Sequence, residues 1–312
     1  MSSSSSPVIE TRNLSKRFKE VQAVYRLNMK VNEGEIFGFL GPNGAGKTTT
    51  FKMIMGLMYP TEGEVFINGE RVGADSVHIR KNLSYLPERV SFYDHLTPLQ
   101  TLHFFCELKG VDKSITIPLL EEVGLTDRMY DEVGTFSKGM VQLLGVAQSM
   151  IGNPPLYIFD EPMGGLDARW VKVIREKIRA LNEQGATILF SSHILSEVQG
   201  LCDRVAIINK GKLVAEDSLA NLRRDLHLKP RLEITITSLS GKVPDLLSSI
   251  EGIDAVDIKG DKLIVTCDAK VRLEVIIKLA QEGLDIQEFR TIDPSLEEVF
   301  MKVTSSEEEG GF

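Results

Sequence analysis

The stretch GPNGAGKTT, residues 41–49, decides how the rest of this sequence is interpreted. It follows an apolar run expected to form a strand, residues 35–40, and precedes an apolar helix expected over residues 48–58. It begins with the pattern G-x-x-x-x-G-K-[ST], in which backbone N–H groups surround nucleotide phosphates, the lysine reaches the β- and γ-phosphates, and the hydroxyl binds Mg²⁺. The expected phosphate site consists of Gly41, Pro42, Asn43, Gly44, Ala45, Gly46, Lys47, Thr48 and Thr49.

The composition indicates which partners and which cellular compartment suit this chain. The chain of 312 residues carries 36 Lys and Arg against 44 Asp and Glu, and its net charge of -8 disfavours a nucleic acid as the main partner. Cys106, Cys202 and Cys267 lie far apart and form no C-x-x-C pair. We therefore expect reduced thiols in a reducing, cytosolic compartment.

No apolar run approaches the roughly 20 residues needed to span a bilayer. The best candidate, residues 143–151, is interrupted by Gln148 and Ser149. Residues 1–7 have neither a basic nor an apolar segment typical of a signal peptide, and we expect a disordered leader there. The polar tail, residues 305–312, is also expected to be disordered.

The first part of the chain has the pattern of an α/β fold. Apolar runs at residues 156–162, 186–193 and 204–216 alternate with helical segments, which predicts a parallel sheet covered on both faces. Residues from about 89 to 153 have helical periodicity and no clear strand pattern, so we expect a helical subdomain inserted into this fold. The predicted domain covers residues 8–228.

A second, smaller domain is expected over residues 229–304. Its alternating apolar runs and short helical stretches predict a βαββαβ arrangement that ends in a helix over residues 294–303. The chain would then combine a phosphate-loop core with a small α+β accessory domain.

Two acidic residues follow the apolar strand at residues 156–159. Because the carboxyl ends of parallel strands share one edge of a sheet, Asp160 is expected beside the phosphate loop, where it can hold Mg²⁺ through water. Glu161 is then positioned to activate a water molecule as a general base. Taken without the phosphate loop, the same pair is equally consistent with a solvated surface.

The order of the next motifs resembles one family. FSKGM at residues 136–140, GGLD at 164–167 and SSH at 191–193 resemble the nucleotide-binding subunit of ATP-binding-cassette (ABC) transporters. Other phosphate-loop NTPases, including kinases and GTPases, lack the FSKGM element. The resemblance covers residues 8 to about 228 and implies an ATPase with ATP and Mg²⁺ as cofactors.

In that family the signature loop contacts ATP held by a second subunit, which implies a homodimer. The residues implied are Ser137, Lys138 and Gly139, with Asp167 in the loop that follows the acidic pair. The usual form of the signature is LSGGQ, so Lys138 replaces a glycine and Met140 a glutamine. A helix cap with neighbouring core residues is the structural alternative for this stretch.

Two further residues match positions that contact the nucleotide in the family. His193 resembles the histidine that contacts the γ-phosphate and orients the attacking water. Phe18, in LSKRF, resembles the aromatic residue that stacks on adenine. A structural role is the alternative for His193, and core packing is the alternative for Phe18.

Glu88, in YLPERVSFY (residues 85–93), occupies the position of a glutamine that touches Mg²⁺ or the attacking water in the family. A carboxylate is a harder metal ligand, so we expect Glu88 to act as a catalytic and metal-binding residue. The segment that follows would meet a membrane permease, with Phe92 and Tyr93 as anchors. A local aromatic cluster under a loop is the alternative.

The second domain and its PSLEEVF ending resemble ATPases of ABC-2 type exporters. Within that group the chain most resembles ATPases that serve nitrous oxide reductase maturation, which implies a copper- or sulfur-related cargo and a periplasmic protein reached through the permease. ATPases for the export of drugs, polysaccharides and sodium share much of this resemblance and are alternatives. The implied location is the cytoplasmic face of the membrane. A soluble cassette ATPase acting on ribosomes or DNA is the alternative, disfavoured by the single cassette, the absence of heptads and the negative charge.

Overall fold

The computed structural model describes residues 7–73, 75–226, 228–237, 243–247, 250–295 and 297–302. The chain divides into two compact units, Met1–Ser218 and Leu219–Phe312. The expected leader and tail fall almost wholly outside the described residues. Among the described helices none is both long and apolar enough to cross a membrane.

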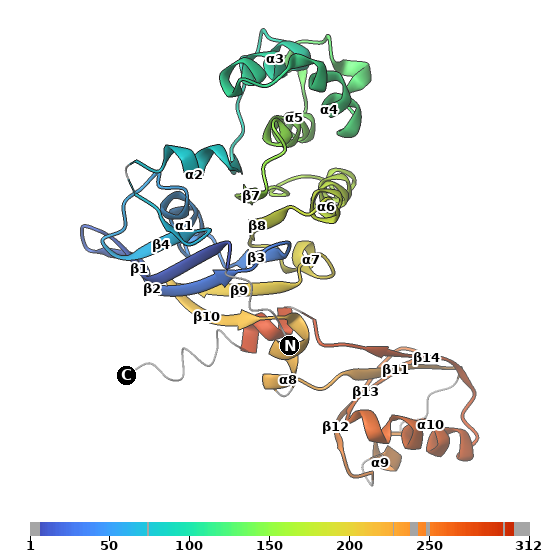
Figure 1. The fold of residues 1–312 in the computed structure, drawn as a ribbon. Helices are drawn as coiled ribbons and strands as arrows, with labels where there is room; N and C mark the ends of the chain where they lie inside the picture. The colour runs from blue at the N-terminus through green and yellow to red at the C-terminus, as the bar shows by residue number, and fades with distance from the viewer. Residues whose placement is uncertain are drawn as a thin grey trace. The chain divides into compact units, whose positions relative to one another are not determined.

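The centre of the first unit is a six-stranded sheet in the order β10-β9-β3-β8-β7-β6 (Figure 1). Its strands are β3 (Ile36–Leu40), β6 (Leu83–Leu86), β7 (Leu156–Phe159), β8 (Thr187–Ser192), β9 (Arg204–Asn209) and β10 (Lys212–Asp217). Strands β6, β7, β8, β3 and β9 run parallel, and the middle three are buried along their whole length, as expected for a sheet covered on both faces.

The apolar run at residues 204–216 is not one parallel strand. It turns at Lys210 and Gly211, both with positive φ, and returns as β10 antiparallel to β9. The predicted parallel sheet therefore acquires an antiparallel edge, because a two-residue turn can join only antiparallel neighbours.

An antiparallel sheet, in the order β2-β1-β4-β5, lies on the other side of α1. Its strands are β1 (Ile9–Phe18), β2 (Val21–Val31), β4 (Glu62–Ile67) and β5 (Glu70–Arg71), and the helix is α1 (Lys47–Ile54). One buried cluster combines Phe37 and Phe39 of β3 with Phe51 of α1 and apolar residues of β1, β2 and β4. Helix α1 is shorter than the expected residues 48–58, because Gly56 has φ 67° and turns the chain away.

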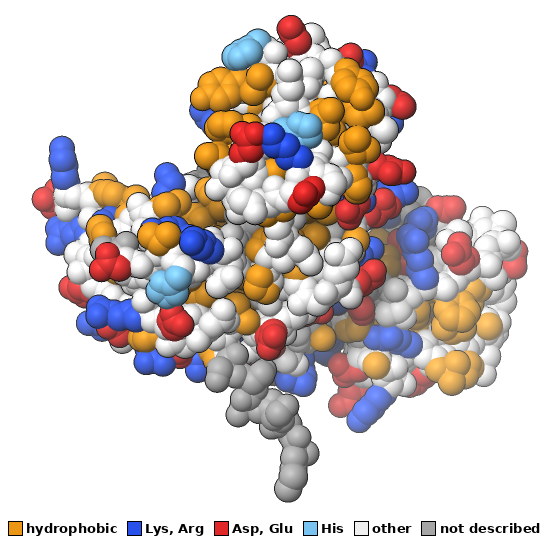
Figure 2. Space-filling model, turned by 45° about the horizontal axis from the view of Figure 1, so that its top comes forward, with side chains coloured by type: hydrophobic (Ala, Val, Ile, Leu, Met, Phe, Trp, Pro, Cys, Tyr) orange, Lys and Arg blue, Asp and Glu red, His pale blue; other side chains and the backbone are white. Residues whose placement is uncertain are grey.

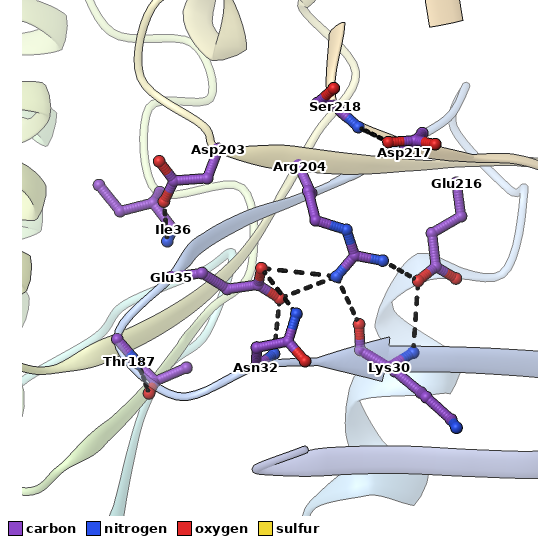
Figure 3. Close-up of polar contacts among 11 residues, drawn as sticks. Lys30, Asn32, Glu35, Ile36, Thr187, Asp203, Arg204, Glu216, Asp217 and Ser218 are labelled. Carbon is purple, nitrogen blue, oxygen red and sulfur yellow. Dashed lines mark hydrogen bonds and ion pairs between the residues drawn. The ribbon is translucent and has the colours of Figure 1, made fainter. Parts of the chain in front are cut away.

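A polar cluster joins the two sheets at one end (Figure 3). Arg204 Nη1 lies 3.1 Å from Glu35 Oε1, and its Nη2 lies 2.5 Å from Glu216 Oε1. Arg204 Nη1 also donates to the carbonyl of Lys30, in β2, at 3.1 Å. One guanidinium therefore connects β9 with the end of β2, the start of β3 and β10.

The remaining helices of the first unit include a group that stands beyond the sheets (Figure 1). The α-helices are α2 (Val77–Lys81), α3 (Pro98–Lys109), α4 (Thr116–Glu122), α5 (Lys138–Met150), α6 (Ala168–Glu183) and α7 (Leu195–Val198), with 3-10 turns at Lys113–Ile115, Thr126–Arg128 and Val133–Thr135. Helix α3 begins with a capping box between Thr97 and Gln100. The structure describes no strand between residues 87 and 155, in agreement with the expected helical insertion.

The second unit contains a four-stranded antiparallel sheet in the order β12-β13-β11-β14. Its elements are α8 (Leu219–Asp225), β11 (Arg231–Ile236), α9 (Val243–Leu247), β12 (Ile253–Lys259), β13 (Lys262–Cys267), α10 (Arg272–Gln281), preceded by a 3-10 turn at Ala269–Val271, β14 (Ile286–Ile292) and a helix over 297–302. The βαββαβ order is confirmed. Helix α8 belongs to this unit, and Arg223 forms an ion pair with Asp293, so the division lies ten residues before the expected boundary after residue 228.

Candidate functional site

The phosphate loop leads from β3 into α1 with a left-handed turn. Gly46 precedes the helix with φ 107°, and a Cβ there would lie 2.4 Å from the carbonyl oxygen of Ala23. A Cβ on Gly41 would lie 2.3 Å from the carbonyl oxygen of Ile208. Both positions therefore require glycine, because any side chain would press against backbone. The first backbone N–H groups of α1 are left free to bind an anion.

Lys47 is folded back onto its own loop. Its Nζ donates hydrogen bonds to the carbonyls of Gly41, at 2.6 Å, and Pro42, at 3.2 Å. The side chain is only 6% exposed. The ammonium group is thus held inside the loop, and phosphate oxygens would replace some of these carbonyl oxygens as its hydrogen-bond acceptors.

Asp160 and Glu161 end β7 beside this loop, as predicted. Glu161 has φ 50°, and its backbone N–H donates a hydrogen bond to the Ser191 hydroxyl at 2.9 Å. Ser191 in turn donates to Asp160 Oδ1 at 2.7 Å. One hydroxyl from β8 therefore fixes both acidic residues at the end of the neighbouring strand β7.

The Glu161 carboxylate lies between two basic side chains. Its Oε1 is 3.1 Å from Lys47 Nζ, and its Oε2 is 2.8 Å from His193 Nδ1. Lys47 begins α1 after β3, Glu161 follows β7 and His193 follows β8. The ends of three neighbouring strands of the sheet therefore bring these groups together. The imidazole is 36% exposed, whereas Glu161 is 7% exposed. The buried Glu161 carboxylate therefore lies beside a side chain that reaches solvent.

Two adjacent cavities open over these residues. One, of about 300 Å³, is lined by the phosphate loop with Ala23, Glu88 and Glu161. The other, of about 520 Å³, is lined by Asn43, Glu88, Arg89, Val90, Lys138, Val141, Gln142, Glu161, Gly164, Gly165 and His193. Glu88 is exposed and lines both, so it stands at their common border. Burial, then the charges of Asp160 and Glu88, raise the pKa of Tyr85.

The oxygens present at the site suit Mg²⁺. Asp160 Oδ2 is buried and accepts no hydrogen bond from the residues described, and Glu161 Oε1 is buried and paired with Lys47 Nζ at 3.1 Å. Such oxygens favour a cation or a water bound to one. The described residues contain no cluster of three His, Cys, Asp or Glu that could hold a metal by themselves. This fits an ion that takes its remaining ligands from Thr48, water and nucleotide phosphates.

The signature residues begin α5 some distance along the chain from the phosphate loop. Ser137 is the N-cap, and its hydroxyl accepts from the Met140 amide at 3.3 Å. A Cβ on Gly139 would lie 2.4 Å from Trp170 Cδ1, so this glycine lets the indole cover the helix end. Neither Ser137 nor Gly139 lines the cavity over the phosphate loop.

Lys138 and Asp167 organise the loop that follows Glu161. Lys138 Nζ donates to the Gly164 carbonyl at 2.6 Å, while Gly164 N donates to the Glu161 carbonyl at 3.0 Å. Asp167 is the N-cap of α6 and accepts from the Arg169 and Trp170 amides, both at 3.1 Å. The signature loop and the acidic loop are therefore hydrogen-bonded within one chain.

Phe18 lies at the end of β1 and is 43% exposed. The ammonium of Lys16 lies 5.2 Å from the centre of its ring. The ring is not part of the core, which disfavours core packing as its role, and its exposed surface is available to a flat group.

A separate apolar cavity of about 310 Å³ lies on the helical part of the unit. It is lined by Ser91, Phe92, Tyr93, Leu96, Thr101, Phe104 and Phe105. The Phe92 and Phe105 rings meet edge to face, with centroids 6.1 Å apart, and Tyr93 is 62% exposed. Figure 2 shows apolar side chains gathered on the helical part of the unit, at the top of the view. The aromatic residues are thus partly a local cluster and partly an open surface.

Sequence reasoning missed two members of the site. Ser191, which binds both acidic residues, lies in the SSH motif and could have been suspected from its place at a strand end. Gln142 is 5% exposed, and its Nε2 finds no hydrogen-bond partner among the described residues, although it lines the larger cavity. Its spacing within an amphipathic helix gave no signal.

Comparisons with known proteins agree with this geometry. Residues 24–164 match the family described as ABC transporter, and residues 218–304 match the C-terminal domain of DrrA1-3-like ATP-binding proteins. An uncharacterised ABC transporter ATP-binding protein of Bacillus subtilis, YhcH, is 35% identical over 97% of this chain and 97% of its own length.

Two further proteins support the same relationship. The bacitracin transport ATP-binding protein BcrA of Bacillus licheniformis is 35% identical over 96% of this chain and 97% of its own length. A solved structure described as the ATP binding subunit of an ABC transporter is 33% identical, with a TM-score of 0.65. That structure covers 71% of this chain and 94% of its own.

Proposed function

The chain is an ATPase of the ABC transporter family, and on this premise we propose that Glu161 activates the water that attacks the γ-phosphate of ATP. The observation that carries the proposal is the position of the Glu161 carboxylate between Lys47 Nζ and His193 Nδ1. A general base must lie within hydrogen-bond reach of the water it activates, beside the phosphate it attacks. Both neighbours of Glu161 are groups suited to phosphate oxygens.

The remaining site residues take roles around the triphosphate. The phosphate loop and α1 bind the phosphates through backbone N–H groups and Lys47, and Phe18 stacks on adenine through its open face. Thr48, Asp160 and Glu88 hold Mg²⁺, which neutralises charge on the phosphates when it is bound. His193 contacts the γ-phosphate and keeps the water oriented.

The ATP-binding site is completed by a second copy of the chain. Ser137, Lys138 and Gly139 begin a helix whose N-terminus favours an anion, but Ser137 and Gly139 do not line the phosphate cavity of their own chain. We infer that Ser137 and Gly139 reach the γ-phosphate held by a partner, with Asp167 at the same interface, while Lys138 holds Gly164 of its own chain at this helix end. Two nucleotides are then enclosed in a homodimer, and hydrolysis opens it.

Opening and closing of this dimer drive a membrane permease, to which the chain binds at the cytoplasmic face. The apolar cavity around Phe92, with the exposed Tyr93, is the surface we assign to the permease. A soluble cassette ATPase acting on ribosomes or DNA is the alternative. Copurification of a membrane protein would separate the two.

We propose export as the direction of transport, supported by the match of residues 218–304 to the DrrA1-3-like C-terminal domain. The cargo has two candidates. The similarity to BcrA, which is named for bacitracin transport, favours an antibiotic as the cargo. The resemblance to nitrous oxide reductase maturation ATPases favours a copper- or sulfur-related species that is passed to a periplasmic protein. Bacitracin sensitivity and copper content of a strain lacking the gene would distinguish them.

The experiment that tests the site mixes two inactive variants. Lys47→Ala removes the phosphate-binding cation of one chain, and Ser137→Arg blocks the signature of the other. In a mixed dimer both changes fall in one composite site, which leaves the second site intact. ATP hydrolysis above that of either variant supports the arrangement, and no recovery in verified mixed dimers counts against it.

A further inference from the structure

Strand β14 (Ile286–Ile292) forms one edge of the sheet in the second unit. It pairs with β11 on one side, and no strand of the described residues pairs with its other side. Residues 287–291 are all exposed. An edge strand of this kind presents unpaired backbone N–H and C=O groups, which can bind a further strand.

The sequence of β14, IQEFRTI, is complementary to itself. Its middle residue is Phe289. If two copies run antiparallel about Phe289, each Glu288 lies opposite Arg290 of the second copy, and the two Phe289 rings face each other. Opposite charges at directly opposed positions stabilise an antiparallel pair, and a two-fold arrangement makes each contact twice.

The side chains needed for this contact are available. Glu288 forms no ion pair with the described residues. Arg290 binds Glu233 through Nε at 2.9 Å and Nη2 at 2.8 Å, but its side chain is 59% exposed. A guanidinium carries five N–H donors, so Arg290 can bind a second carboxylate. Phe289 is 56% exposed and offers an apolar centre.

The irregular part of the strand lies away from this centre. The ladder with β11 shifts register between Thr235, opposite Glu288, and Ile236, opposite Ile286. From Glu288 to Ile292 the pairing is regular. The stretch that carries the complementary charges is therefore flat enough to accept a further strand.

The opposite edge of the same sheet has this property only over a short stretch. Strand β12 (Ile253–Lys259) has Val256 as its middle residue, and pairing about Val256 would place Asp257 opposite Ala255. Pairing about Ile258 would place Asp257 opposite Lys259, but Lys259 ends the strand, so only three residues of each copy would pair. Self-complementarity over the whole strand is thus specific to β14, and Ile258 marks the shorter alternative that a control has to test.

We propose that β14 pairs antiparallel with β14 of a second copy and joins the two sheets into one. The contact lies in the second unit and needs no nucleotide. If the first unit acts as proposed above, this contact would keep two cassettes together while the nucleotide sites are open, since a tethered partner has a high effective concentration.

Charge exchange in the full chain tests the pairing without nucleotide. Glu288→Arg and Arg290→Glu should each raise the dimer dissociation constant by at least about fivefold, because each places like charges in opposition. An equimolar mixture of the two variants should dimerise like the wild type, since every opposed pair is again of opposite charge. Sedimentation velocity over a concentration series measures all four samples.

A cysteine at the proposed two-fold axis gives a second, geometric test. Phe289→Cys should form an interchain disulfide with an added thiol oxidant, whereas Ile258→Cys on the exposed face of β12 should not. A wild type that stays monomeric at every concentration, variants that dimerise as well as the wild type, or equal crosslinking at both positions would each overturn the proposal. In the last two cases β14 is not the contact.

The nucleotide-driven dimer is measured separately in Glu288→Arg. If MgATP still promotes dimerisation there, the cassette contact stands whatever the outcome for β14. If the wild type forms the nucleotide-free dimer but MgATP promotes no dimerisation in Glu288→Arg, the result counts against the proposed function alone.

Discussion

Lys47 Nζ and Glu161 Oε1 lie 3.1 Å apart at the end of the phosphate loop, with both side chains almost fully buried. The lysine that would bind phosphate therefore already has an anionic partner in its own chain. ATP has to displace this carboxylate from the ammonium before the phosphates can occupy the loop. The same carboxylate also contacts His193 Nδ1 at 2.8 Å, and on our proposal this contact would keep it beside the attacking water.

Glu161→Gln should lower the rate of ATP hydrolysis at least about 100-fold, the usual contribution of a general base. It should also bind ATP more tightly than the wild type, because the neutral amide competes less for Lys47. Single-turnover hydrolysis and equilibrium nucleotide binding measure the two effects. Glu197→Gln, at another buried carboxylate of 6% exposure, is the matched control. Wild-type hydrolysis in Glu161→Gln would remove Glu161 as the base.

Lys47→Ala should abolish tight MgATP binding and also destabilise the first unit. Removing one partner of a buried ion pair leaves an uncompensated charge and costs about 3 kcal/mol. The double variant Lys47→Ala with Glu161→Gln should regain most of that stability without regaining ATP binding. Denaturant unfolding and nucleotide binding of Lys47→Ala, Glu161→Gln and the double variant check this. If Lys47→Ala and the double variant are equally stable, the two residues are not energetically coupled in the folded state.

Glu88→Gln should make ATP hydrolysis less dependent on Mg²⁺ concentration. A carboxylate adds a negative charge that the metal must offset, whereas glutamine offers a neutral oxygen and an N–H₂ donor. ATPase rates across a Mg²⁺ series, with and without chelator, measure the shift. Glu132→Gln, at an exposed acid outside both cavities, serves as control. Superimposable curves would mean that Glu88 is only a solvated acid.

Lys138→Met should lower kcat and leave the KM for ATP almost unchanged. The lysine holds the Gly164 carbonyl at 2.6 Å, and Gly164 N binds the Glu161 carbonyl, so its loss loosens the loop that positions the base. Lys138→Arg should restore part of the rate, since it keeps a donor. Lys172→Met removes an exposed lysine on α6 and should have no effect. A raised KM with normal kcat would indicate direct phosphate contact instead.

The strand ends that carry Asp160, Glu161 and His193 could be predicted from the sequence. Each follows a short apolar run, and parallel strands bring their carboxyl ends to one edge. The pairing of Lys47 with Glu161 could not, because it depends on side-chain directions across two strands. The same holds for Ser191, whose hydroxyl binds both acids.

The antiparallel parts of the fold were harder to predict. The run at residues 204–216 is apolar throughout, and only the turn at Lys210 and Gly211 shows that it folds into a hairpin. The cluster of Glu35, Arg204 and Glu216 left no signature either, because its members are separated by up to 181 residues in sequence and meet only when two sheets pack. Patterns of local periodicity carry no information on such contacts.

That cluster should make stability depend on pH when its arginine is removed. Burial raises the pKa of Glu216, and Arg204 opposes the rise. A group whose pKa is higher in the folded state binds its proton more tightly there. The free energy of unfolding therefore falls as pH rises from the pKa of the unfolded state through the pKa of the folded state. Arg204→Met would widen the pH range between these two pKa values, because it removes the positive charge that lowers the pKa of Glu216 in the folded state.

We therefore expect Arg204→Met to be destabilised by about 2 kcal/mol at pH 8, less than a fully buried pair would lose because the guanidinium is 26% exposed. The loss should shrink as pH falls toward 4.5, where Glu216 takes up a proton in both states. The sole tryptophan, Trp170, lies in the first unit, so its fluorescence reports unfolding of that unit in denaturant. Adding Glu216→Gln to Arg204→Met should flatten the pH dependence. A loss of stability that stays constant from pH 4.5 to 8 would show that Arg204 acts through packing against Phe37, 5.2 Å from its ring centre, and not through charge.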